Sequence, residues 1–353
     1  MRDKHIHVAK DSALLKTIYK QVGEKLDTGG AAFILKLSVK FIFYASLTVL
    51  SYWALYLIGN PMVFLLCFVA YGFISMLFAF NFSHDFSHNT IFKSKNANNL
   101  CFVFIYSLVG AHAEAWKQRH LHSHHYAPNV EGYDSDLKIS KLIRVVPDSP
   151  HYWYHRYQHW YAPIAYTTYS LFWVFVKDFV ILFSKSEYNE NKNFIYDLSF
   201  WTQKAFYLSV VFVFPLLFSL QSWQIVLTGF LLMHLSQSLF LLFTFFMTHH
   251  VEDTEYPTTN EDGFINSSWM MNQIKSSNDM HPFSETANFI LGGFNNHIAH
   301  HLFPHYHHIH YPALNRILYK ILLEHGITPN QTSYWGGIVS HLKLLRRMSC
   351  KTI

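Results

Sequence analysis

The chain has 353 residues, of which 51% are hydrophobic, 18% are aromatic and only 14% are charged. Because soluble globular proteins carry about 25% charged residues, this composition excludes an ordinary soluble domain and predicts an integral membrane protein. The net charge of +5 is modest and no basic–aromatic pattern accompanies it, which excludes nucleic acid as a partner.

The first 35 residues are polar and rich in lysine. They contain no apolar core of the kind that a signal peptide needs, so we expect the N-terminus not to be exported. Two apolar runs of 22 residues follow, at 37–58 and 61–82. At about 1.5 Å per residue each helix is roughly 33 Å long, enough to cross a hydrocarbon core of about 30 Å. Only Gly59 and Asn60 separate the runs, which predicts a transmembrane hairpin.

A second hairpin is predicted at 202–220 and 223–247, with Gln221 and Ser222 as its tip. Neither tip carries Lys or Arg, whereas the segments that flank the hairpins do, so both termini and both large connections are expected to be cytoplasmic. We therefore predict one domain over 1–353. Its fold class is an all-α integral membrane protein, with four transmembrane helices in two hairpins and a cytoplasmic helical cap.

Two further apolar runs are expected to form interfacial or re-entrant helices. Residues 100–113 are too few to span a bilayer, and 161–183 contain Lys177 and Asp178. The polar segment 184–199 is interpreted as a linker. A last segment, 313–324, has the amphipathic pattern of a helix that lies on the membrane surface or caps the cytoplasmic region.

Histidine occurs 25 times and gathers in three boxes. His84 and His88 form the first box at the end of the second apolar run, four residues apart and therefore on one helix face. In the second box His120 and His124 share a face, and His125 lies beside them. Neutral imidazoles crowded this closely favour metal binding over a solvated loop.

The third box consists of His297, His300 and His301. Four later histidines are expected to be surface or outer-sphere residues: His305, His307, His308 and His310. If only the two hairpins cross the membrane, all three boxes lie on one side of it. Eight nitrogen ligands without thiolate suit a pair of iron ions better than a closed zinc site with four ligands.

As a set, these motifs resemble the membrane fatty acid desaturases, in particular the bacterial linoleoyl-CoA or acyl-CoA desaturase branch. The similarity runs from about residue 40 to 320 and is carried by HDFSHNTIFKSKNAN, WKQRHLHSHHYAPNVEGYDSDL and GGFNNHIAHHLFPHYHHIHYP. Each box alone is a weak signal, but the combination is highly specific. The resemblance implies that all eight box histidines bind two Fe ions: His84, His88, His120, His124, His125, His297, His300 and His301.

Two positions depart from that branch, and one further ligand is implied. His297 stands where much of the branch has Gln, which should strengthen the site. His122 is an additional histidine, expected in the outer sphere. The family also takes a ligand from the end of its fourth span, where His250 is the preferred match and His249 the alternative.

Several polar residues near the boxes are expected to support the ligands. Asp134 and Asp136 can accept hydrogen bonds from the second ring nitrogens of ligating imidazoles. Asn296, next to the third box, is a candidate for holding an ordered water at the metal. His234 lies in mid-span and is interpreted as a packing residue hydrogen-bonded to a neighbouring helix, although polar residues inside a membrane are functional candidates.

The resemblance implies an oxidoreductase that uses O₂ and a di-iron centre to remove two hydrogens from a long acyl chain, as acyl-CoA or acyl-lipid, leaving a cis double bond. The chain has no His-Pro-Gly-Gly cytochrome b5 signature. Cys67, Cys101 and Cys350 are too scattered for an iron–sulfur cluster or a disulfide framework. We therefore expect an external electron donor, ferredoxin or cytochrome b5 with its reductase, on the basic cytoplasmic face, and membrane lipid as the other partner.

Two alternative functions stay open at this point. A lipid hydroxylase or epoxygenase of the same superfamily differs only by a small shift in substrate position. A histidine-rich membrane metal transporter would place histidines along several spans, whereas only His234 lies deep within a predicted span here.

Overall fold

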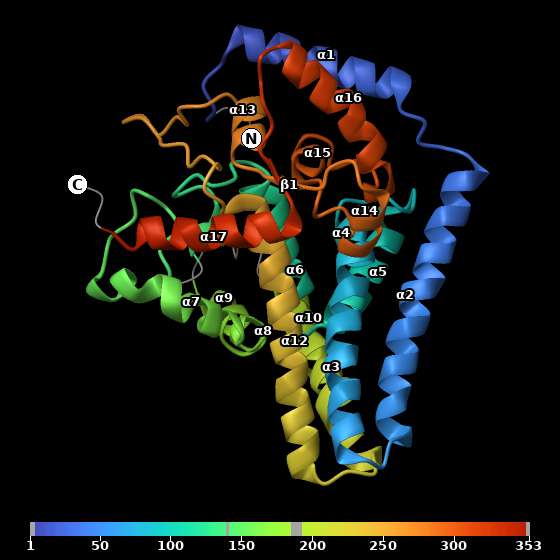
Figure 1. Cartoon of the computed structure of the whole chain (residues 1–353). Coiled ribbons are helices and arrows are strands. Elements are labelled where there is room, and N and C mark those ends of the chain that lie inside the picture. Colours follow the sequence, from blue (N-terminus) through green and yellow to red (C-terminus); the bar gives the residue numbers. More distant parts are fainter. Residues whose placement is uncertain (1–3, 139–140, 185–192, 351–353) are drawn as a thin grey trace. The chain divides into compact units, whose positions relative to one another are not determined.

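The structure is a computed structural model that describes residues 4–138, 141–184 and 193–350. Most of these residues are helical, and loops and two short strands connect the helices (Figure 1). The chain divides into two compact units, which we describe separately. The span unit comprises residues 29–117 and 164–242. The histidine unit comprises residues 1–28, 118–163 and 243–353.

Four helices are long and apolar enough to cross a membrane. They are Ala31–Leu57, Pro61–Ser87, Phe194–Phe218 and Trp223–His249. The first is α2 and the last is α12; the second consists of α3 (Pro61–Phe78), a π-helical turn (Ala79–Ser83) and α4 (His84–Ser87). The third consists of α10 (Phe194–Leu208), a π-helical turn (Ser209–Val213) and α11 (Phe214–Phe218). Each of the four predicted runs therefore coincides with a helix of spanning length.

The third of these helices begins earlier than predicted, which corrects part of the expected linker. Asn193 caps α10 by accepting a hydrogen bond from Tyr196 N at 3.0 Å, so residues 194–199 are helical. Phe194 and Ile195 in this helix are apolar, but the polar residues around them in the sequence made the segment resemble a linker. The remainder of the linker, 185–192, lies outside the described residues.

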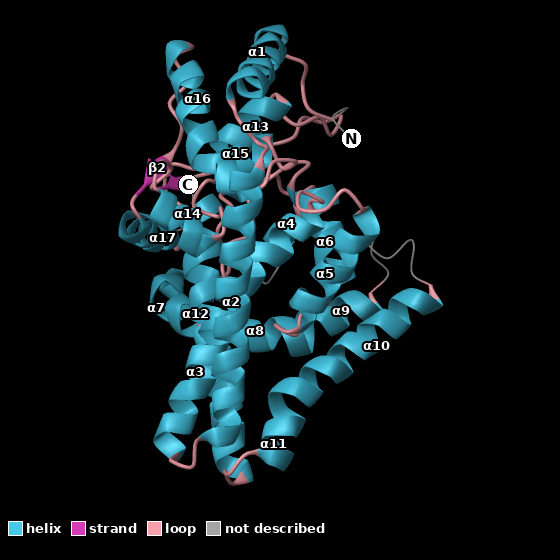
Figure 2. Ribbon diagram, turned by 90° about the vertical axis from the view of Figure 1, so that its right-hand side faces the viewer, coloured by secondary structure: helices cyan, strands magenta, loops and turns pink. Residues whose placement is uncertain are grey.

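The tips of the two helix pairs lie together in the span unit (Figure 2). Gln221 Nε2 donates to Gly59 O at 2.8 Å and to Ile58 O at 3.0 Å. Along the helices, α3 and α12 approach closely at Gly72, where a Cβ would lie 2.5 Å from Ser236 Oγ. A glycine is therefore required for this contact, as is common where apolar helices pack in membranes.

The elements between the two pairs are shorter than predicted and broken. For the expected run 100–113, the structure has α5 (Lys95–Ser107) and then α6 (Ala113–Gln118). For 161–183, it has α7 (Gln158–Tyr166), α8 (Tyr169–Phe172), a π-helical turn (Trp173–Lys177) and α9 (Asp178–Phe183). The chain bends by 80° between the parts before and after the break at 167–168.

A buried ion pair fixes this region to α10. Lys204 Nζ lies 2.7 Å from Asp178 Oδ2 and also donates to Gly110 O at 2.7 Å and Val174 O at 2.8 Å. All three ammonium protons thus have an acceptor. His234 is likewise engaged, with Ser170 Oγ 2.5 Å from Nδ1 and Tyr207 Oη 2.9 Å from Nε2, which confirms its interpretation as a packing residue.

The histidine unit consists of short helices around one apolar core. Its longer elements are α1 (Ala9–Lys25), α13 (Trp269–Lys275), α14 (Glu285–Leu291), α15 (His297–Leu302), α16 (Tyr311–Glu324) and α17 (Tyr334–Met348). A π-helical turn covers Arg119–His124, and 3₁₀ turns cover Ser135–Lys138, Trp153–Tyr157 and His308–His310. Strand β1 (Asp279–Met280) pairs in parallel with β2 (Gln331–Thr332).

Helix α1 packs into this core, although the N-terminal segment was expected only to be polar. Leu14, Ile18 and Val22 recur four residues apart, are buried, and contact the apolar face of α16. The predicted amphipathic helix 313–324 is confirmed as α16, and its apolar face lies against this protein core.

Candidate metal centre

The second histidine box lies on a π-helical turn, a feature that is frequent at functional sites. The hydrogen bond from His125 N to His120 O at 3.0 Å closes this wider turn. It brings the Nε2 atoms of His120 and His125 to 3.2 Å from each other. The wide turn thereby turns His124 to a different side from this pair.

Four buried histidines converge in the histidine unit. His124 comes from the π-helical turn, His249 is the last residue of α12, and His297 and His301 lie one turn apart on α15. One ring nitrogen of each lies within 4.8 Å of those of the other three. We call these four residues the histidine tetrad.

The closest contacts in the tetrad join Nε2 atoms. His249 Nε2 lies 2.7 Å from His297 Nε2 and 3.2 Å from His301 Nε2. On the far side of the rings, His249 Nδ1 donates to Ser276 O at 2.8 Å, and His301 Nδ1 donates to Gln273 Oε1 at 2.7 Å. Because a neutral imidazole has one N–H, the Nε2 atoms of His249 and His301 face each other with lone pairs.

Protonation of the rings does not remove the repulsion between these facing lone pairs. Burial, followed by the charges of neighbouring imidazoles, holds the pKa of His301 and that of His297 well below the ordinary histidine value. Facing nitrogen lone pairs that resist protons are satisfied by a metal cation, and imidazole suits iron, zinc or copper. The donor set of the tetrad therefore fits a metal ion.

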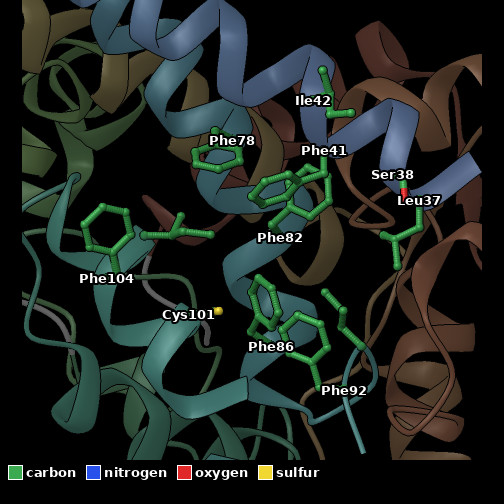
Figure 3. Close-up of a pocket in the computed structure, with 12 residues that line it drawn as sticks. Leu37, Ser38, Phe41, Ile42, Phe78, Phe82, Phe86, Phe92, Cys101 and Phe104 are labelled. Atoms are coloured by element: carbon green, nitrogen blue, oxygen red, sulfur yellow. The ribbon is translucent and has the colours of Figure 1, made fainter. Parts of the chain in front are cut away.

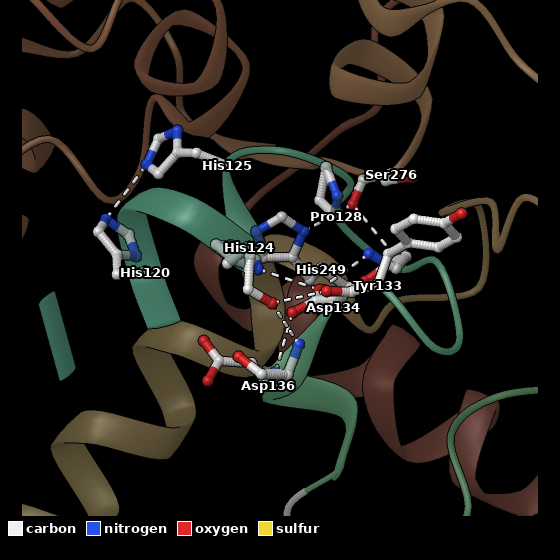
Figure 4. A network of polar contacts seen from close by, with 12 residues as sticks. His120, His124, His125, Pro128, Tyr133, Asp134, Asp136, His249 and Ser276 are labelled. Atoms are coloured by element: carbon white, nitrogen blue, oxygen red, sulfur yellow. Dashed lines mark hydrogen bonds and ion pairs between the residues drawn. The ribbon is translucent and has the colours of Figure 1, made fainter. Parts of the chain in front are cut away.

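His124 is oriented by Asp134, as predicted (Figure 4). Its Nδ1 lies 3.0 Å from Asp134 Oδ2, while its Nε2 has no hydrogen-bond partner among the described residues. Burial opposes protonation of His124, but the adjacent carboxylate raises its pKa overall. A carboxylate in this position raises the basicity of a ligating imidazole.

Asp136 lies beside Asp134 and His124. Its backbone N donates to Asp134 Oδ1 at 2.9 Å, and its carboxylate pairs with Arg119 Nη1 at 3.4 Å. Asp136 therefore helps to hold the Asp134 carboxylate in place.

Asn129 connects the second box to two other parts of the site. Its backbone N donates to Asp134 Oδ2 at 3.0 Å. Its Nδ2 lies near three carbonyl oxygens, those of His249 at 3.0 Å, Glu255 at 3.2 Å and Ser276 at 3.3 Å. The residue has a left-handed backbone, with φ of 60°. One buried side chain thus ties together the segments that carry His124 and His249.

The helix that carries the third box is held at its N-terminus by Asp279 from β1. One Asp279 oxygen accepts from Ile298 N at 2.9 Å, and the other accepts from Tyr319 Oη at 2.9 Å. Burial raises the pKa of Asp279 to about 7. An acceptor at a helix N-terminus satisfies N–H groups that have no partner within the helix, so Asp279 fixes the direction of α15.

The loop before this helix requires glycine and uses the predicted Asn296 structurally. Gly293 has φ of 83°, and a Cβ there would lie 2.3 Å from His308 Cβ. Asn296 Nδ2 donates to Asn288 Oδ1, and its Oδ1 accepts from Asn315 Nδ2, both at 2.8 Å. Both ends of this amide are engaged, so the geometry gives no support to a role in holding water.

The structure places two of the other candidates outside the tetrad. His250 Nδ1 lies 2.9 Å from Tyr256 Oη, and the carbonyl of His250 accepts from His341 Nδ1 at 2.7 Å. His249, the alternative in the sequence prediction, is the histidine whose ring joins the tetrad, because a helix that ends at residue 249 aims that side chain at the cluster. His122 is exposed on the outside of the π-helical turn.

The remaining box histidines form smaller groups within each unit. In the histidine unit the rings of His120 and His300 stack 5.8 Å apart, and His125 lies 4.5 Å from His300 and 4.6 Å from His301. In the span unit the rings of His84 and His88 lie 5.0 Å apart. Of the four later histidines, His307 and His308 are buried.

Sequence reasoning missed Gln273, Ser276 and Asp279, which orient the tetrad. They lie in a polar run, 272–279, that resembles an exposed loop in sequence but is buried throughout except for Lys275. The amide and hydroxyl side chains of this run follow the apolar residues 269–271, which is the one sequence feature that points to burial. That pattern alone does not distinguish a buried polar network from a surface loop.

Comparison with known proteins identifies the family of the chain. The fatty acid desaturase family matches residues 59–333. The sn-1 linoleoyl-lipid 6-desaturase of Arthrospira platensis is 28% identical over 309 residues, 85% of this chain and 83% of that protein.

Two eukaryotic relatives are longer than this chain. The acyl-lipid (8-3)-desaturase of Physcomitrium patens is 28% identical over 87% of this chain and 64% of its own length. The acyl-lipid (8-3)-desaturase B of Dictyostelium discoideum is 30% identical over 79% of this chain and 63% of its own length. With its apolar helices and its buried histidines, the chain belongs to the fatty acid desaturase family of oxidoreductases.

Proposed function

We propose that the chain is an O₂-dependent di-iron desaturase that introduces a cis double bond into the acyl chain of a membrane lipid. The observation that carries this proposal is the histidine tetrad, whose Nε2 atoms face one another while the Nδ1 atoms of His124, His249 and His301 are held by protein acceptors. Such second contacts fix the tautomer and direction of metal-bound imidazoles.

One iron would be held by His124, His249, His297 and His301. For the second iron, the sequence pattern supplies His84, His88, His120, His125 and His300. Bound iron would supply the oxidising power that removal of hydrogen from an unactivated methylene requires, with O₂ as the co-substrate.

The residues of the chain have three tasks in this reaction. Asp134, the Ser276 carbonyl and Gln273 hold the imidazoles at fixed angles, and Asp279 fixes the helix of the third box. The tetrad is 2% exposed or less at every member, which excludes bulk water from the oxidising centre. Positioning of the acyl chain beside this centre then selects the carbons that react.

The relatives favour lipid-linked substrates. Most of their names specify acyl-lipid or linoleoyl-lipid substrates. Several names specify position 5 or 6 of the chain. We therefore propose an acyl-lipid in place of the acyl-CoA alternative, with the new double bond near the carboxyl end.

The proposed topology is two transmembrane hairpins with the site and both termini on the cytoplasmic side. The bonds from Gln221 to the first tip support it, because they bring the two uncharged tips to one end of the span unit. The 80° bend within 153–183 supports a re-entrant path there. An external electron donor, ferredoxin or cytochrome b5, would bind the basic cytoplasmic surface.

Expression in a host with a compatible electron donor tests the proposal. Mass spectrometry of the host lipids should show a new double bond in lipid-linked chains, and the purified protein should contain two iron ions. A hydroxylated or epoxidised chain would identify the superfamily alternative. No altered chain from iron-loaded protein supplied with donor, O₂ and lipid would refute desaturation.

A further inference from the structure

The span unit contains an apolar pocket that the proposed reaction does not use (Figure 3). Its volume is about 390 Å³, within the 300–1,000 Å³ typical of small-molecule sites. It lies among α2, the end of the second spanning helix, and α5. The lining residues are Leu37, Ser38, Phe41, Ile42, Phe78, Phe82, Phe86, Ile91, Phe92, Cys101, Phe104 and Ile105.

The rim of the pocket belongs to the lipid-facing surface of these helices. Ile42 is 63% exposed and Phe104 is 57% exposed, although both are apolar. On helices that cross a membrane, such surfaces contact lipid hydrocarbon and not water. The pocket therefore opens sideways to the bilayer, and its natural occupant is an acyl chain.

Exposed lysines are adjacent in sequence to lining residues at two places. Lys36 directly precedes Leu37, and Lys93 directly follows Phe92. Leu37 and Phe92 come from the ends of their segments that are near the membrane surface, because α2 begins at Ala31 and the second spanning helix ends at Ser87. Lysines at that level attract anionic lipid headgroups.

The pocket lies on the other side of a helix from the first histidine box. Phe82 and Phe86 point into the pocket in Figure 3, whereas His84 and His88 are not among its lining residues. Residues two apart on a helix are rotated by about 200° about the helix axis and so lie on nearly opposite faces. A chain in this pocket is therefore separated from the histidines by the helix itself and is not the chain that reacts.

We propose that the pocket holds the second, non-reacting acyl chain of a diacyl lipid substrate with an anionic headgroup above Lys36 and Lys93. The proposal rests on the acyl-lipid function above and deepens it. A lipid with two chains that presents one of them to the metal centre needs a place for the other chain, and a single-chain acyl-CoA does not.

Photo-crosslinking tests the occupancy without any need for activity. The full chain is reconstituted in vesicles that contain an anionic diacyl lipid with a diazirine on one acyl chain, and the crosslinks are mapped by mass spectrometry. We expect crosslinks at 37–42, 82–92 and 101–105. Crosslinks spread evenly over the lipid-facing residues of all four spanning helices, or absent from these segments, would overturn the proposal.

Substrate comparison then identifies the chain. Cys101→Trp fills the pocket, and Leu100→Trp is the matched control, because Leu100 is 72% exposed on the same helix and does not line the pocket. Excluding about two methylenes from an apolar pocket lowers affinity about tenfold. We expect Cys101→Trp to lower kcat/KM about tenfold for the diacyl lipid and to leave it unchanged for the corresponding single-chain lysolipid.

The lysines provide an independent variant that leaves the pocket intact. The double variant Lys36→Gln/Lys93→Gln should weaken use of an anionic diacyl lipid by about fivefold for each lysine at low salt and leave a zwitterionic lipid unaffected. The control is Lys10→Gln/Lys16→Gln, which removes two exposed charges from α1.

The outcomes separate this proposal from the proposed function. Desaturation of acyl-CoA without desaturation of diacyl lipid would overturn the pocket assignment and leave the desaturase function standing. Equal losses on diacyl lipid and lysolipid would also overturn it. Absence of any product, with the expected crosslinks present, would refute the function but support occupancy of the pocket by a lipid chain.

Discussion

The two units bury polar groups in opposite ways. In the span unit, Lys204 has an acceptor for each of its three ammonium protons, including Asp178. In the histidine unit, three tetrad rings are held at Nδ1, so the Nε2 atoms of His249 and His301 face each other with lone pairs 3.2 Å apart. A complete set of partners indicates a structural role, whereas a set completed only by a cation indicates a site.

The sharpest test of this contrast compares two adjacent histidines. We expect His249→Ala to lose product by more than about 100-fold and to lower the iron content, since even residues that only orient a metal ligand contribute about 10–100-fold. His250→Ala should keep most of both, because His250 lies outside the tetrad and contacts Tyr256. Product analysis and metal analysis of the two variants suffice, and the reverse order would contradict the geometry.

In the span unit, removing one partner of the Lys204–Asp178 pair should lower the stability of the protein. Lys204→Met leaves the Asp178 carboxylate buried beside an apolar side chain, and breaking such a pair lowers the free energy of unfolding by about 3–5 kcal/mol. Thermal denaturation of the purified variants measures this effect. Lys204→Met/Asp178→Leu is the control, and it should recover much of the loss. A double variant no more stable than Lys204→Met would show that the charge pair is not the cause.

A smaller effect is expected from the carboxylate behind His124. Asp134→Asn keeps the shape of the side chain but removes the charge that supports the imidazole, and we expect metal affinity to fall about 10–100-fold. Asp136→Asn is the matched control, because its carboxylate pairs with Arg119, whereas the Asp134 carboxylate lies 3.0 Å from His124 Nδ1. Metal titration of the apoproteins would contradict this assignment if the two variants bound equally.

The smallest expected effect concerns acid pH. Burial lowers the pKa of His341 to about 4, so the folded protein binds fewer protons at this residue than the unfolded chain. Its contribution to stability is therefore present above about pH 6.5 and is lost as the pH falls towards 4. His341→Asn keeps a side-chain donor for the His250 carbonyl and does not titrate. Its melting temperature should fall less than that of the wild type between pH 7 and 4.5, and parallel curves would exclude His341 as a contributor.

The four candidate membrane spans were predictable because they depend mainly on one property, the length of an apolar run. Apolar runs long enough to cross a bilayer can fold in few ways, and all four predicted runs coincide with candidate spans. Their ends were less certain, since the start of α10 is set by the cap at Asn193 and not by hydropathy. Helix α1 was missed because its apolar face is narrow. Leu14, Ile18 and Val22 recur four residues apart, but the segment around them is rich in lysine.

The histidine boxes were predictable as candidate ligands, but their second contacts were not. The spacing of His297 and His301 places them on one face of any helix, whatever surrounds them. The choice between His249 and His250 depends on where α12 ends, and Asp279 contributes through a pairing with β2, 52 residues away in sequence. Such long-range contacts leave no periodic signal in the sequence, so a three-dimensional structure is needed to find them.

Position 129 imposes two chemical demands at once. The left-handed backbone tolerates glycine, asparagine and aspartate, but the three surrounding carbonyl oxygens require a side chain that donates protons. Glycine tolerates the left-handed backbone but has no side-chain donor. Aspartate would place a negative charge where the carbonyl oxygens need a hydrogen-bond donor. We therefore expect active relatives to keep asparagine at this position, whereas the exposed His122 nearby should tolerate substitution.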